Sequence, residues 1–236
     1  MGLESSYGDR IEIVYNLSHW KLLERLRKKS IEIMDVLALK GIISGIYGSV
    51  VRGDVTPKSD IDIIIPYVLS SHSVELALTG SGFEIYKRII AQATPNSTPK
   101  AHIFLDIEEK KCVTFPLATF RTLEREFYKF GGYLEINALK KDNRVPGCSK
   151  GLMLIEPTEQ GHMESSMYYK EREVAKIVGI SVDIIRERIR VLKRRKKVGR
   201  TGIILSVHLE KEEVFENILR KLAASNPIIR RRLRNE

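Results

Sequence analysis

The sequence of 236 residues lacks several features that mark whole classes of protein. It has only two cysteines, Cys112 and Cys148, in no C-x-x-C arrangement, which argues against a zinc site or a disulfide framework and favours a reducing compartment. Its longest apolar run, Ile63–Leu69, is far shorter than the roughly 18–20 residues that cross a bilayer. The first residues contain no apolar stretch typical of a secretory signal. We therefore expect a cytoplasmic protein that does not enter a membrane.

Positive charge is abundant but unevenly distributed. The net charge is +10, yet residues 1–169 contain 21 Lys and Arg against 21 Asp and Glu. Residues 170–236 contain 19 against 9, and this asymmetry favours a C-terminal segment that binds a polyanion, usually nucleic acid. A solvated basic helix would have the same composition. The wealth of Lys, Arg, Glu and Ile, with only two glutamines, also resembles thermophile proteins.

The apolar pattern predicts helices and strands in the first two thirds of the chain. It predicts a helix over His19–Lys40, with Ser18 as its N-cap, and strands at 42–47, 59–65 and 102–107. From Tyr168 onward, dense charge with helical periodicity takes over. We therefore predict an α+β fold with a mixed β-sheet domain and flanking helices over residues 1–165. A small helical, or winged-helix-like, domain is predicted over residues 166–236.

Two carboxylates on the predicted strand at 59–65 indicate a cation site. Side chains alternate across a strand, so Asp60 and Asp62 share one face while Ile61 and Ile63 share the other. Like charges held this close are stable together only with a cation or a cationic partner between them. Oxygen ligands in this arrangement suit Mg²⁺ or Mn²⁺, which keep water and substrate phosphate in their remaining positions.

The residues before these aspartates are suited to phosphate. Gly48 lets the backbone approach an anion closely, and Ser49 offers a hydroxyl and an amide donor. If Ser49–Arg52 begins a helical turn, its free N–H groups face the same anion. Arg52 and Lys58 are candidate phosphate partners by charge.

A two-metal arrangement needs a third carboxylate, for which the sequence offers two candidates. Asp106 ends the predicted strand at 102–107 and shares a face with His102, and Glu108 follows on that same face. His102 itself is either a base or phosphate contact near this site or a satisfied strand histidine.

These residues together resemble a known superfamily. Gly-Ser, ten residues, then Asp-Ile-Asp-Ile, with a later apolar-Asp-apolar strand, is similar to the DNA polymerase β nucleotidyltransferase superfamily, above all its minimal nucleotidyltransferases. The resemblance covers roughly residues 42–107. It implies that Gly48, Ser49 and Ser59 bind the phosphates of a nucleoside triphosphate such as ATP. It also implies that Asp60, Asp62 and Asp106 hold divalent metals during transfer of a nucleoside monophosphate to an acceptor.

The C-terminal segment resembles a helix-turn-helix. Ser181, after Gly179, is placed to cap a helix whose apolar positions Val182, Ile185, Ile189 and Leu192 recur at helical spacing. The opposite face should expose four basic residues that could meet nucleic acid, namely Arg186, Arg190, Lys193 and Arg194. Val198–Leu209 could form a wing hairpin. The alternative is a helical hairpin that packs on the catalytic domain with its arginines solvated.

The sequence therefore predicts nucleotidyl transfer to an acceptor, with nucleic acid favoured by the basic C-terminus. A different function remains open at this point. The protein could be a nucleic-acid-binding regulator or an antitoxin-like partner that uses its N-terminal domain as a scaffold or to modify that partner.

Overall fold

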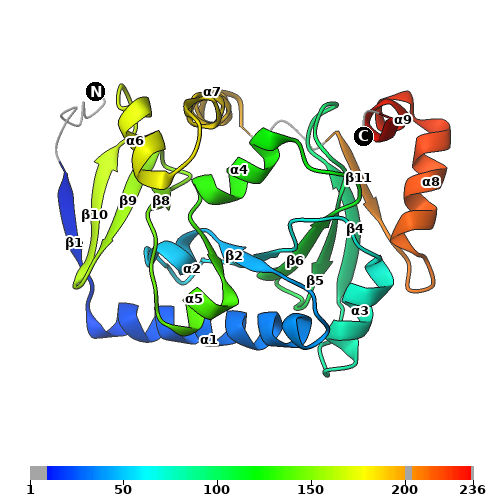
Figure 1. Cartoon of the computed structure of the whole chain (residues 1–236), viewed down its shortest axis with the longest axis horizontal. Helices are drawn as coiled ribbons and strands as arrows, with labels where there is room; N and C mark the ends of the chain where they lie inside the picture. Colours follow the sequence, from blue (N-terminus) through cyan, green and yellow to red (C-terminus); the bar gives the residue numbers. More distant parts are fainter. Residues whose placement is uncertain (1–9, 200–203, 235–236) are drawn as a thin grey trace. The chain divides into compact units, whose positions relative to one another are not determined.

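The computed structural model describes residues 10–199 and 204–234 (Figure 1). These residues cluster into two compact units, each assembled from three separate parts of the chain. The first unit comprises residues 10–28, 47–59 and 125–199, and the second comprises 29–46, 60–124 and 204–234. Two helices, α1 (Leu17–Leu39) and α4 (Thr122–Phe130), contribute residues to both units. No helix in the described ranges has both the length and the apolar character needed to cross a membrane.

The first unit contains an antiparallel sheet in the order β1-β10-β9-β8, where β1 is Ile11–Val14, β10 is Gly161–Ser166, β9 is Met153–Thr158 and β8 is Gly147–Cys148. Gly161 pairs with Val14, and a Cβ at this position would lie 1.8 Å from the carbonyl oxygen of Ile13, so only glycine fits. The remaining elements of this unit are α2 (Ser49–Arg52), β7 (Tyr133–Glu135), α5 (Ile136–Lys140), α6 (Glu171–Val178) and α7 (Val182–Val198).

The core of the first unit joins this sheet to the two helices of the basic segment. One buried cluster contains Leu154 of β9 and Leu152, which directly precedes this strand. The same cluster includes Met167 and, from α7, Ile185 and Leu192. The apolar stripe predicted for α7 is therefore the face that packs, because burying it removes the stripe from water.

The second unit contains a mixed sheet in the order β11-β4-β5-β6-β3-β2. β3 and β6 are parallel, whereas β6-β5, β5-β4 and β4-β11 are antiparallel, which confirms the predicted mixed sheet with flanking helices. The strands are β2 (Gly45–Tyr47), β3 (Ile61–Ile64), β4 (Lys87–Gln92), β5 (Lys100–Phe104), β6 (Lys111–Pro116) and β11 (Leu205–His208). The helices are α3 (Ser71–Thr79), α8 (Phe215–Ser225) and α9 (Pro227–Arg234).

Two contacts tie α8 into the second unit. The ring of Phe215 packs edge-on against Phe115 of β6, with centroids 5.7 Å apart, and both side chains are fully buried. Glu216 accepts hydrogen bonds from the backbone N–H and the hydroxyl of Ser71, both at 2.7 Å, and so caps the start of α3.

Three sequence predictions differ from the structure. The N-cap of α1 is Asn16, whose side chain accepts from the backbone N–H of His19 at 2.9 Å, and not Ser18. β11 pairs with β4, so the described part of Val198–Leu209 forms no wing hairpin; residues 200–203 of this stretch lie outside the described residues. The compact units also cross the predicted boundary at 165/166, because α6 and α7 cluster with β8–β10 while β11, α8 and α9 cluster with β3–β6.

Candidate active site

The Gly-Ser pair of the predicted site begins a helical turn in the first unit. Gly48 has φ +96° and directly precedes α2, so glycine is favoured here by the backbone conformation. A Cβ on Gly48 would meet no atom within 4 Å, which means that the space beside this glycine is open. The hydroxyl of Ser49 donates to that of Ser59 at 3.0 Å, and the Ser59 hydroxyl also accepts from the backbone N–H of Thr56 at 2.9 Å. The two predicted serines therefore lie together.

Lys58 lies in the turn between these serines and is exposed. Its backbone N–H donates to the Thr56 hydroxyl at 3.2 Å, which fixes the turn while the ammonium group faces solvent. This position is compatible with the predicted contact to a phosphate.

Arg52 has a role that the sequence analysis missed. Its guanidinium is buried and binds both carboxylate oxygens of Asp54, with Nε at 2.9 Å and Nη2 at 2.8 Å. Its Nη1 donates to the carbonyl oxygens of Gly131 at 2.6 Å and Cys148 at 3.3 Å. These contacts correct the prediction of a phosphate partner, because they use the donors of Arg52 to hold two distant loops against α2.

The paired aspartates lie at the start of β3 in the second unit. Asp62 stands between Ile61 and Ile63, which are 2% and 0% exposed, and Asp60 directly precedes the strand and is exposed. In the parallel pairing, Asp62 lies opposite Cys112 of β6, which in turn lies opposite Phe104 of β5. Residues paired in this way share one face of a sheet, so Asp60 and Asp62 project from the face that also carries Cys112.

Asp106 lies two residues beyond the end of the strand that it was predicted to end. β5 ends at Phe104, and Asp106 falls in the turn that leads to β6. Its Oδ1 accepts from the backbone N–H groups of Lys110 at 2.8 Å and Lys111 at 3.1 Å, while its Oδ2 is 3.7 Å from the Lys111 ammonium. β6 separates β5 from β3, so this carboxylate closes a hairpin turn two strands from Asp62.

The reserve candidate, Glu108, is exposed and forms an ion pair with Lys110 at 2.6 Å. The hydrogen bond from Lys110 lowers the pKa of Glu108. Within the described residues, no three His, Cys, Asp or Glu side chains gather closely enough to hold a metal ion. Neither candidate therefore completes a three-carboxylate cluster with Asp60 and Asp62 in the structure.

His102 is a satisfied strand histidine. Its Nδ1 lies 2.9 Å from the hydroxyl of Thr114, the residue paired with it on β6, and 3.8 Å from the sulfur of Cys112. Burial, with a smaller contribution from Lys100, lowers the pKa of His102 to about 4, so the ring is neutral at physiological pH. The interpretation of His102 as a base or phosphate contact is not supported by these partners.

The segment predicted to be a helix-turn-helix contains two consecutive helices of the first unit, α6 and α7, and the motif itself stays a prediction. α6 ends at Gly179, which has φ +73°, and Ser181 caps α7 by accepting from the backbone N–H of Ile184. Glu126 accepts from both the hydroxyl and the backbone N–H of Ser181, which joins this turn to α4.

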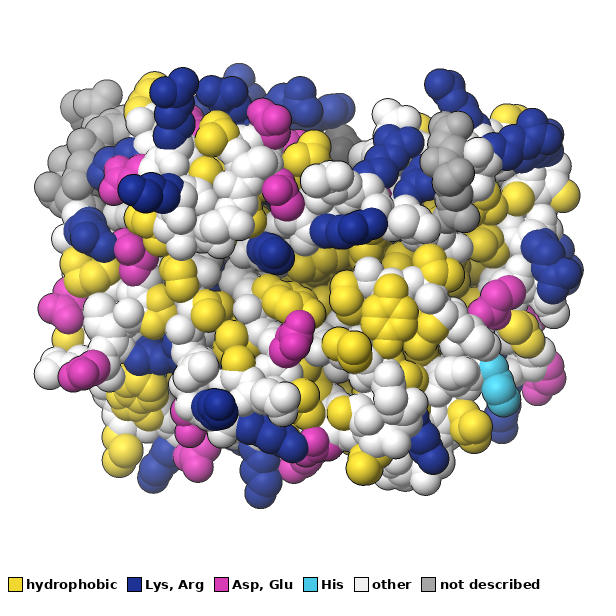
Figure 2. All heavy atoms as spheres, viewed as in Figure 1, with side chains coloured by type: hydrophobic (Ala, Val, Ile, Leu, Met, Phe, Trp, Pro, Cys, Tyr) yellow, Lys and Arg dark blue, Asp and Glu magenta, His cyan; other side chains and the backbone are white. Residues whose placement is uncertain are grey.

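The four predicted basic residues of α7 are all exposed, namely Arg186, Arg190, Lys193 and Arg194. Figure 2 shows Lys and Arg side chains gathered over α6 and α7 at the upper edge of this view. Arg188 instead packs inward over the ring of Phe127, 4.9 Å from its centroid, and burial lowers the pKa of Arg188. The negative charge of Glu187 raises the pKa of Arg188, so Glu187 stabilises the charged form of this inward-facing arginine.

Comparison with known proteins identifies the domain. Residues 23–116 match the family model described as "Nucleotidyltransferase domain", and this stretch contains Gly48–Asp62 and Asp106. Residues 23–116 therefore match a nucleotidyltransferase domain, consistent with a minimal nucleotidyltransferase of the DNA polymerase β superfamily, and the predicted resemblance is confirmed for this stretch. No curated protein and no solved structure matched the chain.

Proposed function

We propose that this protein transfers a nucleoside monophosphate from a nucleoside triphosphate to an acceptor and releases pyrophosphate. The observation that carries the proposal is the family match over a segment in which Gly48 and Ser49 begin a helical turn and Asp60 and Asp62 share one face at β3. Carboxylates held at a rigid strand are positioned in advance, which is how phosphoryl-transfer proteins supply most of their catalysis.

The donor set at β3 fits one hard divalent cation. Asp60 and Asp62 would hold the cation, since carboxylates are the hard oxygen ligands that Mg²⁺ or Mn²⁺ prefers, and triphosphate oxygens and water would supply its remaining ligands. A bound cation would withdraw charge from the phosphates at which the reaction occurs. The sequence predicts a two-metal site, whereas the lack of a cluster of three metal-binding side chains among the described residues supports a single cation held by Asp60 and Asp62.

The chain's own residues then have defined tasks. Gly48 lets the triphosphate approach the start of α2, the backbone N–H of Ser49 and the hydroxyl of Ser59 donate to it, and Lys58 adds positive charge. The acceptor hydroxyl attacks the α-phosphorus in line, forming a new P–O bond as the bond to the pyrophosphate oxygen breaks. The proton of the acceptor leaves to water, and pyrophosphate is released.

Nucleic acid is the acceptor class that the charge distribution favours. Arg186, Arg190, Lys193 and Arg194 lie on the exposed side of a capped helix and are spaced so that successive cations follow each other along it. Such a row of cations contacts phosphates irrespective of sequence.

A second candidate function is favoured by a specific observation. Asp106 is committed to a hairpin turn, and the described residues contain no cluster of three metal-binding side chains. These facts also fit a domain that binds a nucleoside triphosphate without transferring it and acts as a nucleic-acid-binding regulator or an antitoxin-like partner.

A transfer assay separates the two. Protein is incubated with labelled nucleoside triphosphates, Mg²⁺ and RNA, DNA or protein acceptors, and triphosphate binding is measured in parallel. Asp60→Asn and Asp62→Asn should each reduce product by about 100-fold or more, while Asp183→Asn, which removes an exposed aspartate of α7, should change little. Product that persists undiminished in Asp60→Asn would refute the assigned residues. Triphosphate binding without product for any acceptor would favour the regulator.

Asp106→Asn distinguishes the one-cation site from a three-carboxylate site. If Asp106 only closes the β5–β6 turn, its substitution should lower the melting temperature and reduce transfer by less than about tenfold. A loss as large as that of Asp60→Asn would show that Asp106 is a ligand after all.

A further inference from the structure

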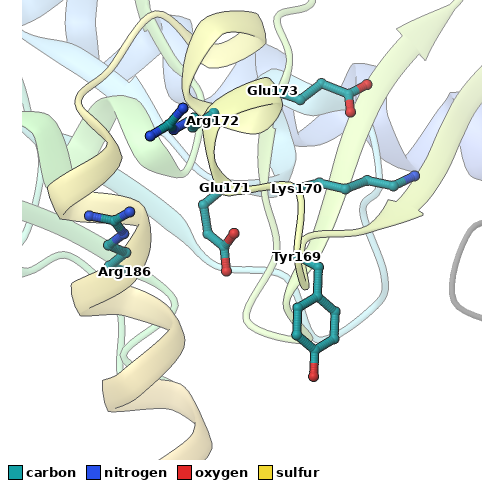
Figure 3. Close-up of a pocket in the computed structure, with 6 residues that line it drawn as sticks. All are labelled: Tyr169, Lys170, Glu171, Arg172, Glu173 and Arg186. Atoms are coloured by element: carbon teal, nitrogen blue, oxygen red, sulfur yellow. The ribbon is translucent and has the colours of Figure 1, made fainter.

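An open pocket lies where β10 leads into α6, within the first unit. Its volume is about 400 Å³, and six residues line it: Tyr169, Lys170, Glu171, Arg172, Glu173 and Arg186 (Figure 3). Five of the six are consecutive in the chain, and the sixth comes from the second turn of α7. The pocket therefore joins the β10–α6 connection to the row of basic residues on α7.

Tyr169 is the unusual residue of this pocket. Its side chain is 82% exposed, and its backbone has φ +62°, in the left-handed region that a bulky residue rarely adopts. The preceding Tyr168 is half-buried, with the Lys193 ammonium 4.5 Å from its ring centroid. Of the two adjacent tyrosines, Tyr168 is thus half-buried and Tyr169 is exposed. The backbone N–H of Lys170 donates to the carbonyl oxygen of Met167 at 3.3 Å, and this turn directs the ring of Tyr169 outward.

Strained backbone that presents an exposed aromatic ring is typical of a functional position. An exposed tyrosine ring offers a flat apolar face, on which a nucleobase stacks irrespective of its sequence. A base within a duplex already stacks on both sides, so this ring can engage only an unpaired base.

The charges around the ring suit the backbone of the same strand. Figure 3 shows Arg186 and Arg172 reaching toward the same side, Glu171 between Arg186 and Tyr169, and Lys170 and Glu173 directed away from them. Arg186 is exposed and is the first of the basic row on α7 that continues through Arg190. The Glu171 carboxylate is an acceptor for an amino group on a base edge, so an acidic residue here is compatible with a nucleotide.

We propose that this pocket binds an unpaired nucleotide of a single-stranded nucleic acid, with its base stacked on Tyr169 and its phosphate on Arg186. The strand then continues along the exposed cations of α7. This inference rests on the proposed function only in treating the bound strand as the acceptor. Binding is measured without triphosphate or divalent cation, so failure of this site is distinguishable from failure of transfer.

The test is fluorescence anisotropy of the full chain with a labelled single-stranded adenine RNA of roughly 12 nucleotides, over salt concentrations from about 50 to 200 mM. A DNA strand of the same sequence and an RNA duplex of the same length are measured alongside. Both single strands should bind more tightly than the duplex. Tyr169→Ala should weaken binding about tenfold with an unchanged salt dependence, because stacking releases no counterions, and Tyr169→Phe should bind within about twofold of the parent.

Arg186→Ala provides an independent readout. Loss of one phosphate contact on a single strand should make the slope of log affinity against log salt shallower by about 0.7. Lys28→Ala, which removes an exposed charge from α1, is the matched control and should leave both affinity and slope unchanged. The proposal is overturned if the duplex binds as tightly as the single strands, or if Tyr169→Ala and Arg186→Ala both bind like Lys28→Ala.

Discussion

Substitution of Arg52 by alanine distinguishes a structural arginine from a phosphate-binding one. The side chains of Arg52 and Asp54 are only 6% and 17% exposed, and the guanidinium also holds the carbonyl oxygens of Gly131 and Cys148. Arg52→Ala would leave the Asp54 carboxylate and both carbonyl groups without this partner in a largely buried place.

The size of the effect follows from these contacts. Removal of one partner from a buried ion pair costs about 3–5 kcal/mol, and the partial exposure of Asp54 places the cost near the lower end because water can reach its carboxylate. For a chain of this length, each kcal/mol shifts the melting temperature by roughly 2–4 °C. We therefore expect Arg52→Ala to melt about 6–12 °C below the parent protein.

Thermal and urea unfolding measure this loss, and a titration with nucleoside triphosphate well below the melting temperature measures binding. The double variant Arg52→Met, Asp54→Leu should recover at least about 1 kcal/mol relative to Arg52→Ala, because it no longer buries a lone carboxylate. Triphosphate affinity of Arg52→Ala should stay within about twofold of the parent. An unchanged melting temperature together with a large loss of triphosphate affinity would refute the structural role and restore Arg52 to the phosphate site.

Two further predictions concern single residues near the candidate site. His102 has a pKa of about 4 in the folded chain against an ordinary 6.5. As the pH falls, the unfolded chain therefore binds a proton at this histidine before the folded chain does. The free energy of unfolding should fall by up to about 3 kcal/mol as the pH drops from 6.5 to 4. Urea unfolding of His102→Asn should show a smaller fall over that window, and parallel curves would contradict the assignment. Gly48→Ala and Gly82→Ala should both lose stability, roughly 1–3 kcal/mol, because both glycines have positive φ and open space around them. Only Gly48→Ala should also weaken triphosphate binding, and equal affinities of the two variants would argue against a phosphate contact at Gly48.

The local pattern of apolar and capping residues was sufficient to predict much of the fold. The apolar stripe of α1, the strand carrying Asp62 and the cap at Ser181 each depend on residues within a few positions of one another. The family resemblance drawn from Gly48–Asp62 was also correct, because the motif lies within one continuous stretch.

Partners distant in sequence were not predictable in this way. Arg52 was assigned to phosphate by its charge and its place in the motif, yet its partners Gly131 and Cys148 lie 79 and 96 residues further on. Asp106 has the apolar neighbours of a strand residue, but its hydrogen bonds to Lys110 and Lys111 show that it closes a turn. An alternating pattern does not reveal where a hairpin reverses.

Charge asymmetry gave a different boundary from the compact units for a related reason. The number of lysines and arginines in a segment reflects the surface of that segment, whereas a compact unit is defined by the contacts of its buried residues. The buried face of α7 clusters with Leu154 of β9, and β11 adds to the edge of β4, so the basic segment contributes to both units. Two successive helices, α6 and α7, stand where the helix-turn-helix was predicted, and their core is shared with earlier parts of the chain.

The β5–β6 turn places a lysine, Lys110, near the exposed carboxylate of Asp60, which directly precedes β3. The pKa of Lys110 is raised mainly by its hydrogen bond to Glu108, and the negative charges of Asp106 and Asp60 contribute further. Lys111 lies 3.7 Å from Asp106. Because Lys110 is exposed, its attraction to Asp60 is weak and screened by salt, so a divalent cation with triphosphate can replace it at little cost. The turn that holds Asp106 thus also brings positive charge toward Asp60, one of the two aspartates proposed to bind the cation.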